Sequence, residues 1–221
     1  MAAWPSSADE LVEVQRALAE ADPRPFRLDH DAVIGGCFVC SERGKRGSGS
    51  AGDRLWAAAA TGAETATVDG QAGAPYEAGL LALREAPALE AAVHALEWPP
   101  DVLLIDATGL DHPRRAGLAL HLGAQLDVPT VGVTHRTLLA EGAWPGDERG
   151  ATTPLILDGA VVGHWLRTRA GTRPLAVHAA WRTDPDTAVE VVLATLAGRR
   201  APEPLRRARQ AAREARAADE S

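Results

Sequence analysis

An acidic residue at the end of an apolar run is the first candidate for chemistry in this chain. Asp106 follows 102–105, which is short and continuously apolar and predicts a strand buried on both faces. The loop behind it carries two further polar side chains, Asp111 and His112. Ligands of open α/β sheets bind at the carboxyl ends of strands, so we expect Asp106 in a binding or metal site. The alternative is that Asp106 caps a helix or a turn.

Basic side chains follow two of the predicted elements. Arg114 and Arg115 stand at the start of a predicted helix, where the helix dipole disfavours cations and contact with phosphate is the better explanation. His135 and Arg136 follow another apolar run. An arginine there could bind phosphate, and a histidine could carry protons near neutral pH. His121, on the apolar side of the predicted helix, is typical of a structural histidine.

The two cysteines, Cys37 and Cys40, form the sole C-x-x-C sequence of the chain. A structural zinc site needs a second pair of ligands, and a redox site needs a thioredoxin-like setting. The pair therefore predicts neither, and the simplest expectation for a free cysteine is burial in the core.

The order of predicted elements indicates an α/β fold with one mixed sheet. Apolar periodicity predicts helices over 7–21, 75–96, 114–126 and 184–197. The predicted strands are 33–40, 55–60, 64–68, 102–106, 130–133, 155–157, 161–167 and 175–178. Alternating helices and strands favour parallel pairing, and Asp158-Gly159 predicts a hairpin. Three strands, an αβαβ segment and a closing helix predict the ribonuclease H-like layout, a mixed central sheet flanked by helices.

Length, charge and apolar runs narrow the class of protein. With 221 residues, the chain can form a large core. We expect a helical segment over 1–24, a main domain over 25–200 and a basic C-terminal helix or tail over 201–221. The net charge of −7 argues against nonspecific coating of nucleic acid, although seven arginines between 199 and 216 predict a local basic surface. The Gly/Ser-rich segment around Lys45 and Arg46 predicts a surface loop.

No apolar run approaches the ~20 residues that cross a bilayer. The first residues also lack the charged-then-apolar order of a signal peptide. We therefore expect a cytoplasmic protein without a membrane partner.

Four groups of residues stand in a distinctive order over roughly 33–207. These are Pro75-Tyr76, Gly79 and Arg84-Glu85; Asp106, Gly109, His112-Pro113-Arg114, Gly117, His121 and Gly123; Pro129-Thr130 and Gly132-Val133; and Pro202-Glu203-Pro204. In type and order they resemble endonuclease V, a family that nicks nucleic acid near deaminated purines such as inosine. The resemblance implies a metal-dependent endonuclease that hydrolyses a phosphodiester bond near inosine or deoxyinosine, an activity of the DNA-repair type.

The resemblance also implies a site for Mg²⁺, with Mn²⁺ as a substitute. Hydrolysis at a negatively charged phosphate needs hard cations that neutralise charge and activate water. The implied ligands are Glu85, Asp106 and Asp186, with His135 and Arg136 as further catalytic residues near the scissile phosphate.

Cys37 stands where the family's first strand carries an aspartate. Sulfur is a poor ligand for magnesium and suits softer metals. Three interpretations follow: a magnesium site held by the remaining carboxylates, a site with an altered metal preference that involves Cys37, or loss of catalysis in a protein that still binds nucleic acid. A hydrolase for a different phosphate ester is a further alternative.

A pocket for the deaminated base is implied around a wedge that begins at Pro75. Tyr76, the only tyrosine of the chain, could stack on a base, whereas Glu77 would repel phosphate. The implied substrate-binding residues are Pro75, Tyr76, Gly79, Leu83, Gly109, His112 and Arg114. We expect a monomer whose partner is DNA or RNA that contains a deaminated purine.

Overall fold

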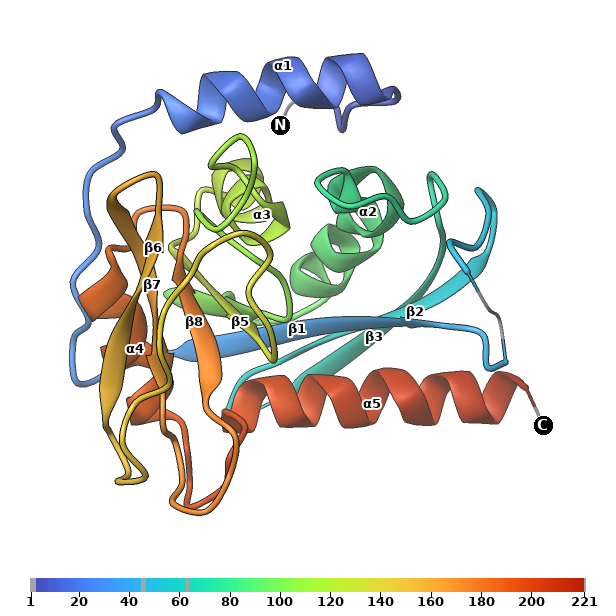
Figure 1. The fold of residues 1–221 in the computed structure, drawn as a ribbon. Helices are drawn as coiled ribbons and strands as arrows, with labels where there is room; N and C mark the ends of the chain where they lie inside the picture. The colour runs from blue at the N-terminus through green and yellow to red at the C-terminus, as the bar shows by residue number, and fades with distance from the viewer. Residues whose placement is uncertain (1–2, 45–46, 63, 221) are drawn as a thin grey trace.

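The structure is a computed structural model that describes residues 3–44, 47–62 and 64–220 (Figure 1). Lys45 and Arg46, in the predicted surface loop, lie outside the described residues. The helices are α1 (Ala8–Ala19), α2 (Leu81–His94), α3 (Leu118–Leu126), α4 (Pro185–Ala194) and α5 (Glu203–Asp219). The strands are β1 (Ile34–Ser41), β2 (Arg54–Ala60), β3 (Thr65–Gln71), β4 (Val102–Ile105), β5 (Thr130–Thr134), β6 (Thr152–Leu157), β7 (Ala160–Leu166) and β8 (Leu175–Ala179).

The strands in the described part of the chain form one mixed sheet in the order β3-β2-β1-β4-β5-β8-β7-β6. β1, β4 and β5 are parallel neighbours, whereas the strands on either side of them pair antiparallel. The predicted mixed sheet and its ribonuclease H-like layout are confirmed. The Asp158-Gly159 hairpin is confirmed as well, because both residues have positive φ and connect β6 to β7.

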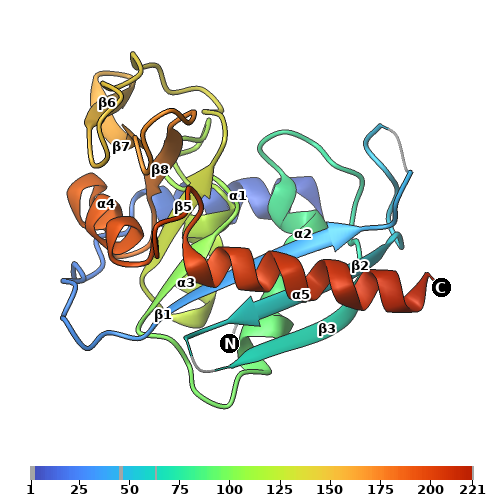
Figure 2. The same cartoon turned by 90° about the horizontal axis from the view of Figure 1, so that it is seen from below.

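Helices cover both faces of the sheet (Figure 1, Figure 2). Leu103 and Ile105 of β4 point to the side of α2 and α3, and α1 lies outside those two helices. Val102 and Leu104 point the other way, into a core shared with α4 and the start of α5. All four side chains of β4 are buried, which explains why the strand has no polar face.

The basic C-terminal helix is part of the domain, because α5 crosses the sheet against β1 and β2 (Figure 2). A Cβ on Gly36 would lie 2.6 Å from the backbone nitrogen of Leu205. Only glycine permits so close an approach of strand and helix. Ala208 and Ala212 continue the contact with the sheet. The helix α5 is therefore held close against β1 and β2.

Two predicted helices begin later than the sequence pattern indicates. α2 begins at Leu81 rather than at 75, because Gly79 has φ of 82° and ends any helical path before it. α3 begins at Leu118 rather than at 114, because Arg115 has φ of 55°. The two segments so freed, 75–80 and 114–117, are loops on the side of α1.

No helix within the described ranges is both long enough and apolar enough to cross a membrane.

His121 makes the stability of the fold sensitive to pH. Its ring lies on α3, 4% exposed, with its centroid 4.6 Å from that of Trp4. Burial lowers the pKa of His121 to about 4, whereas an unfolded histidine has a pKa of ~6.5. Below pH ~6.5 the unfolded chain binds a proton at this histidine that the folded chain does not bind, so a lower pH favours the unfolded state. The stabilisation is thus complete above pH ~6.5 and is lost as the pH falls toward the folded pKa.

We expect His121 to lower the free energy of unfolding by up to about 1.4 kcal/mol per pH unit below pH ~6.5. Urea denaturation between pH 7 and pH 5 measures this slope. A His121→Leu variant should show a shallower slope, and the exposed His30 supplies the control, His30→Gln. Equal slopes in the wild type and His121→Leu would contradict the prediction.

Candidate active site at the end of strand β4

Asp106 directly follows β4, at the carboxyl edge of the parallel part of the sheet. Ile105, the last residue of β4, is paired with Cys37 of β1 on one side and with Gly132 of β5 on the other. The side chain of Asp106 is 26% exposed. The strand order therefore presents this carboxylate at the edge where the neighbouring parallel strands end.

An arginine from the C-terminal helix binds the carboxylate of Asp106. Nη2 of Arg209, on α5, donates to Oδ2 of Asp106 over 2.7 Å. The same guanidinium lies over the ring of Phe38, with Cζ 5.1 Å from the ring centroid, which is a cation–π distance. The sequence pattern does not single out Arg209, whose signal is no more than the basic composition of 199–216. A positive charge that belongs to the chain itself thus faces Asp106.

Glu85, on α2, is the second acidic residue near Asp106. Burial raises the pKa of Glu85 to about 7; the charge of Arg84 opposes this rise and the charge of Asp106 adds to it. The two carboxyl groups therefore interact. Together with Cys37 and four apolar neighbours they line a cavity of about 30 Å³, which is close to the volume of one water molecule.

Cys37 is fully buried in β1 and presents a neutral thiol to this cavity. Burial, followed by the charge of Asp106, raises the pKa of the Cys37 thiol far above its ordinary value. Cys40 packs against Ala208 and Ala212 on the opposite face of the sheet, and neither cysteine is in a disulfide. The C-x-x-C sequence therefore does not form a metal or redox pair.

The predicted group of three carboxylates does not form, and Asp186 is the residue that departs from it. Asp186 lies in the first turn of α4 with its side chain 91% exposed. Its Oδ1 is 3.1 Å from Nε2 of His164, on β7. Within the described residues, no group of three or more His, Cys, Asp and Glu side chains is arranged to hold a metal ion. This structure therefore does not bring Asp186 together with Glu85 and Asp106, and its role as a metal ligand stays a prediction.

A cavity of about 180 Å³ opens beside Asp106. Five segments form its walls: α1, the loop before α2 with the start of that helix, the turn after β4, the start of α3, and the end of β5 with the segment after it. The lining residues are Gln15, Tyr76, Glu77, Gly79, Leu81, Ala82, Asp106, Ala107, Thr108, His112, Leu118, Thr134 and Leu138. The cavity is far larger than one water molecule needs, and its walls combine apolar surface with a few polar groups, as is typical of ligand pockets.

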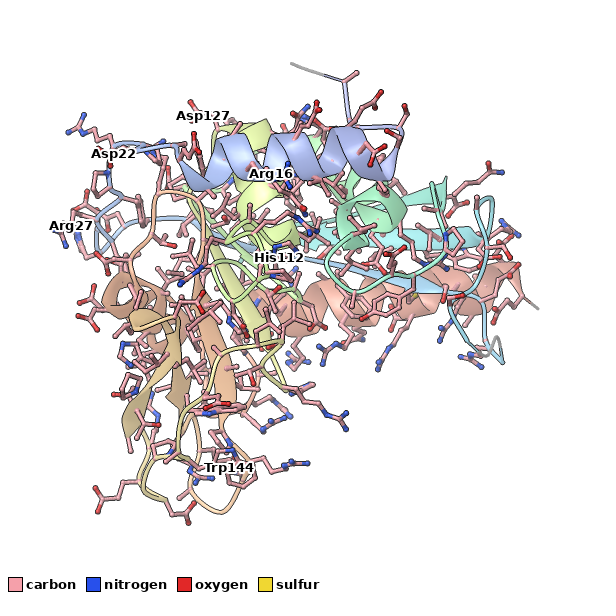
Figure 3. All side chains as sticks on the ribbon, turned by 45° about the horizontal axis from the view of Figure 1, so that its top comes forward. Arg16, Asp22, Arg27, His112, Asp127 and Trp144 are labelled. Carbon is pink, nitrogen blue, oxygen red and sulfur yellow. The ribbon has the colours of Figure 1, made fainter. Side chains whose placement is uncertain are left out.

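The carbonyl oxygen of Gly79 connects the polar side chains around this cavity through hydrogen bonds. It accepts hydrogen bonds from Nε2 of Gln15 at 3.1 Å, from Nη2 of Arg114 at 2.8 Å and from Nε2 of His112 at 3.1 Å. The backbone nitrogen of Arg114 donates to Nδ1 of His112, which fixes a neutral tautomer. Burial lowers the pKa of His112 to about 4. Figure 3 shows His112 on the side of the sheet that α1 covers.

Some of the predicted base-binding residues line the cavity and others do not. Tyr76, Gly79 and His112 are in its wall, and Arg114 reaches the carbonyl of Gly79. Leu83 instead packs against the core beneath α2, and Pro75 is not part of the lining. Gly109 has a packing role, because a Cβ there would lie 2.1 Å from the carbonyl oxygen of Ala179. Gln15 and Ala82 are lining residues that the sequence pattern does not indicate.

A second hollow, of about 370 Å³, gathers positive charge near the same edge of the sheet. It is lined by His135, Arg136, Arg173 and Arg200. Loss of solvation and the charge of Arg200 lower the pKa of His135, while the charge of Asp106 opposes that shift. The hollow and Asp106 are therefore close enough to interact. His135 and Arg136 lie on this basic surface.

The sequence matches a known family over most of its length. A profile of the Endonuclease V family matches residues 24–210. The endonuclease V of Nocardia farcinica is 46% identical over 147 residues, which are 66% of this chain and 64% of that protein. The match to a second relative, from Roseiflexus sp. RS-1, covers 60% of that protein. These two matches thus span less than two thirds of the relatives' own length.

Longer matches extend the similarity to nearly the whole chain. The endonuclease V of Methanopyrus kandleri is 38% identical over 213 residues, 91% of this chain and 86% of that protein. The crystal structure of the endonuclease V of Streptomyces avermitilis superposes with a TM-score of 0.87 at 33% identity, covering 100% of this chain and 98% of that one. The chain belongs to the endonuclease V family.

Proposed function

We propose that this protein is a hydrolase of the endonuclease V type, which binds a deaminated purine of DNA or RNA and cleaves a phosphodiester bond near it. The observation that supports this most is the cavity that opens directly against Asp106. Endonuclease V homologues are nucleases that act on phosphodiester bonds. The endonuclease V of Ciona intestinalis, which shares the fold at 20% identity, has been solved with a DNA that contains an inosine.

In this proposal the base leaves the stack and enters the cavity. Extrusion of a base is the usual way for an enzyme to reach it, and the exposed ring of Tyr76 could stack on the neighbouring base. Polar groups around the carbonyl of Gly79 would meet the edge of the purine. His135 and Arg136 would contact the phosphate at the entrance.

The residues at Asp106 do not fit a magnesium ion, although the endonuclease V family is a metal-dependent group of nucleases. Magnesium takes oxygen ligands in near-octahedral geometry. Asp106 is already paired with Arg209, and Cys37 offers a buried thiol sulfur where an oxygen ligand would be needed. We therefore assign no step to Mg²⁺ or Mn²⁺ in this chain.

A second candidate function is recognition without cleavage. It is favoured by one pair of observations: a thiol in place of the first-strand carboxylate, and the ion pair between Arg209 and Asp106. Such a protein would hold a deaminated base and its phosphate through the same cavity and the same basic hollow. The two candidates share a ligand and differ in whether the strand is cut.

Two assays distinguish three outcomes: cleavage near a deaminated base, recognition of that base without cleavage, and the absence of both functions. Fluorescence anisotropy measures the affinity of the protein for pairs of oligonucleotides, made as DNA and as RNA. The two members of a pair carry inosine or adenosine at one position and are otherwise identical. We expect about tenfold or greater preference for inosine, equal to ~1.4 kcal/mol. Ala82→Leu, which adds bulk to the cavity wall, should remove the preference, and the exposed Ala91 on the same helix provides the control, Ala91→Leu.

Strand cleavage is then measured on the inosine oligonucleotide with Mg²⁺ or Mn²⁺. For the nuclease, Asp106→Ala should reduce the rate about 100-fold or more. Binding without cleavage by the wild type would support the second candidate. Equal affinity for inosine and adenosine would contradict both.

A further inference from the structure

We propose that Arg209 supplies the positive charge at Asp106 from within the chain, so that this site disfavours divalent cations and binds a nucleic-acid phosphate directly. The part of the inference that concerns the divalent cation is independent of the proposed function. The part that concerns phosphate rests on it.

Arg209 is held at Asp106 by contacts on two elements. Nη2 of Arg209 meets the carboxylate over 2.7 Å, and the guanidinium plane is supported by Phe38 of β1. The helix that carries Arg209 is itself fixed by its close contact with Gly36. An arginine supported in this way loses little additional conformational freedom when it binds, because its fork of donors is already oriented.

The guanidinium keeps donors for a further partner. An arginine has five N–H donors, and the contact with Asp106 is made by Nη2. Nε of Arg209 is buried and has no hydrogen-bond partner in the described part of the chain. The buried Nε is out of reach of an incoming phosphate, so the donors that Arg209 can offer to phosphate oxygens while it holds Asp106 are Nη1 and the second hydrogen of Nη2.

The charge around Asp106 also favours an anion over a second cation. Loss of solvation lowers the pKa of Arg200, and the positive charges of Arg173 and Arg209 lower it further. Arg136 lines the same hollow as Arg173 and Arg200. Against these four guanidinium groups stand two carboxyl groups, those of Asp106 and Glu85, which line one small cavity together. A divalent ion at Asp106 would have to displace Arg209 and enter a field of like charge, whereas a phosphate would be attracted to it.

Direct measurement of Mn²⁺ binding to the full-length protein tests the first part. Free Mn²⁺ is followed by electron paramagnetic resonance, without nucleic acid, for the wild type and for Arg209→Gln. We expect weak binding by the wild type and at least tenfold tighter binding by Arg209→Gln, with a further gain in Cys37→Asp/Arg209→Gln. The control is Arg213→Gln, because Arg213 lies one turn further along α5 and contacts the same Phe38 ring, at 5.8 Å.

Arg213→Gln should bind Mn²⁺ as weakly as the wild type does. The inference is overturned if Arg209→Gln binds Mn²⁺ no more tightly than the wild type. Circular dichroism melting of each variant confirms that it is folded. Arg209→Gln alone decides the outcome if Cys37→Asp impairs folding.

Binding of the inosine oligonucleotide in EDTA tests the second part. The wild type should keep its affinity without divalent ions, and Arg209→Gln should lose at least tenfold, whereas Arg213→Gln should lose less than threefold. A wild type that binds only when Mg²⁺ or Mn²⁺ is present would overturn the phosphate part. Failure of the proposed function has a different signature, which is the absence of inosine preference while the Mn²⁺ result stands.

Discussion

Replacing Asp111 by alanine should lower the free energy of unfolding by about 3–5 kcal/mol, because a fully buried carboxylate then leaves several backbone donors without an acceptor. Its two oxygens accept hydrogen bonds from the backbone nitrogens of Leu138, Leu139 and Ala140, at 2.7, 2.8 and 2.8 Å. Nδ1 of His178 lies 3.7 Å from Oδ2. Asp111 thus anchors the segment after β5 to the turn after β4.

Chemical denaturation of Asp111→Ala and Asp111→Asn measures this effect. The asparagine retains one oxygen acceptor, so its loss should be about half that of alanine. Because Leu138 lines the cavity beside Asp106, the alanine variant should also lose the preference for inosine. A loss below about 1 kcal/mol in Asp111→Ala, the size of one ordinary hydrogen bond, would show that the segment does not depend on this carboxylate.

Replacing Arg84 by methionine should cost a similar amount, about 3–5 kcal/mol, since it removes the guanidinium that pairs with the buried carboxylate of Asp53. The side chains of Arg84 and Asp53 are 8% and 6% exposed, and Nη2 lies 3.1 Å from Oδ2. Nη1 of Arg84 also donates to the carbonyl oxygens of Ser50 and Ala74. Arg84 thereby ties α2 to the chain just before Tyr76.

Thermal unfolding compares Arg84→Met with the double variant Arg84→Met/Asp53→Asn. For a chain of this size, each kcal/mol shifts Tm by about 2–4 °C. The double variant should recover at least about 1 kcal/mol, because asparagine removes the buried charge and still accepts from the backbone nitrogen of Ser50. If the double variant is less stable than Arg84→Met, the buried charge is not the cause of the loss.

Local patterns predict the strands and the place of Asp106 well, because a buried parallel strand must be continuously apolar. β4 is the clearest example, with its four side chains buried on two faces. The segment 75–80 shows the limit of the same reasoning. Its composition continues the helical pattern of α2, but the left-handed backbone of Gly79 ends the helix and turns the chain toward the cavity.

The composition of the site is harder to predict, because its residues come from distant parts of the chain. Arg209 contacts Asp106 across 103 positions, and the contact depends on how closely α5 crosses Gly36. Asp186 has the expected residue type at the start of a helix, yet α4 lies against β7 and β8 and the carboxylate meets His164. Residue type and order are local properties, whereas the meeting of these side chains is a property of the packed sheet.

The passage of α5 across β1 has a consequence for the order in which the protein is made. A nascent chain that ends before residue 203 can already contain every strand of the sheet, but Phe38 and the face of β1 around Gly36 still lack their covering helix. The carboxylate of Asp106 lacks its arginine for the same period. The site therefore reaches its final charge only when one of the last helices to leave the ribosome docks on one of the first strands.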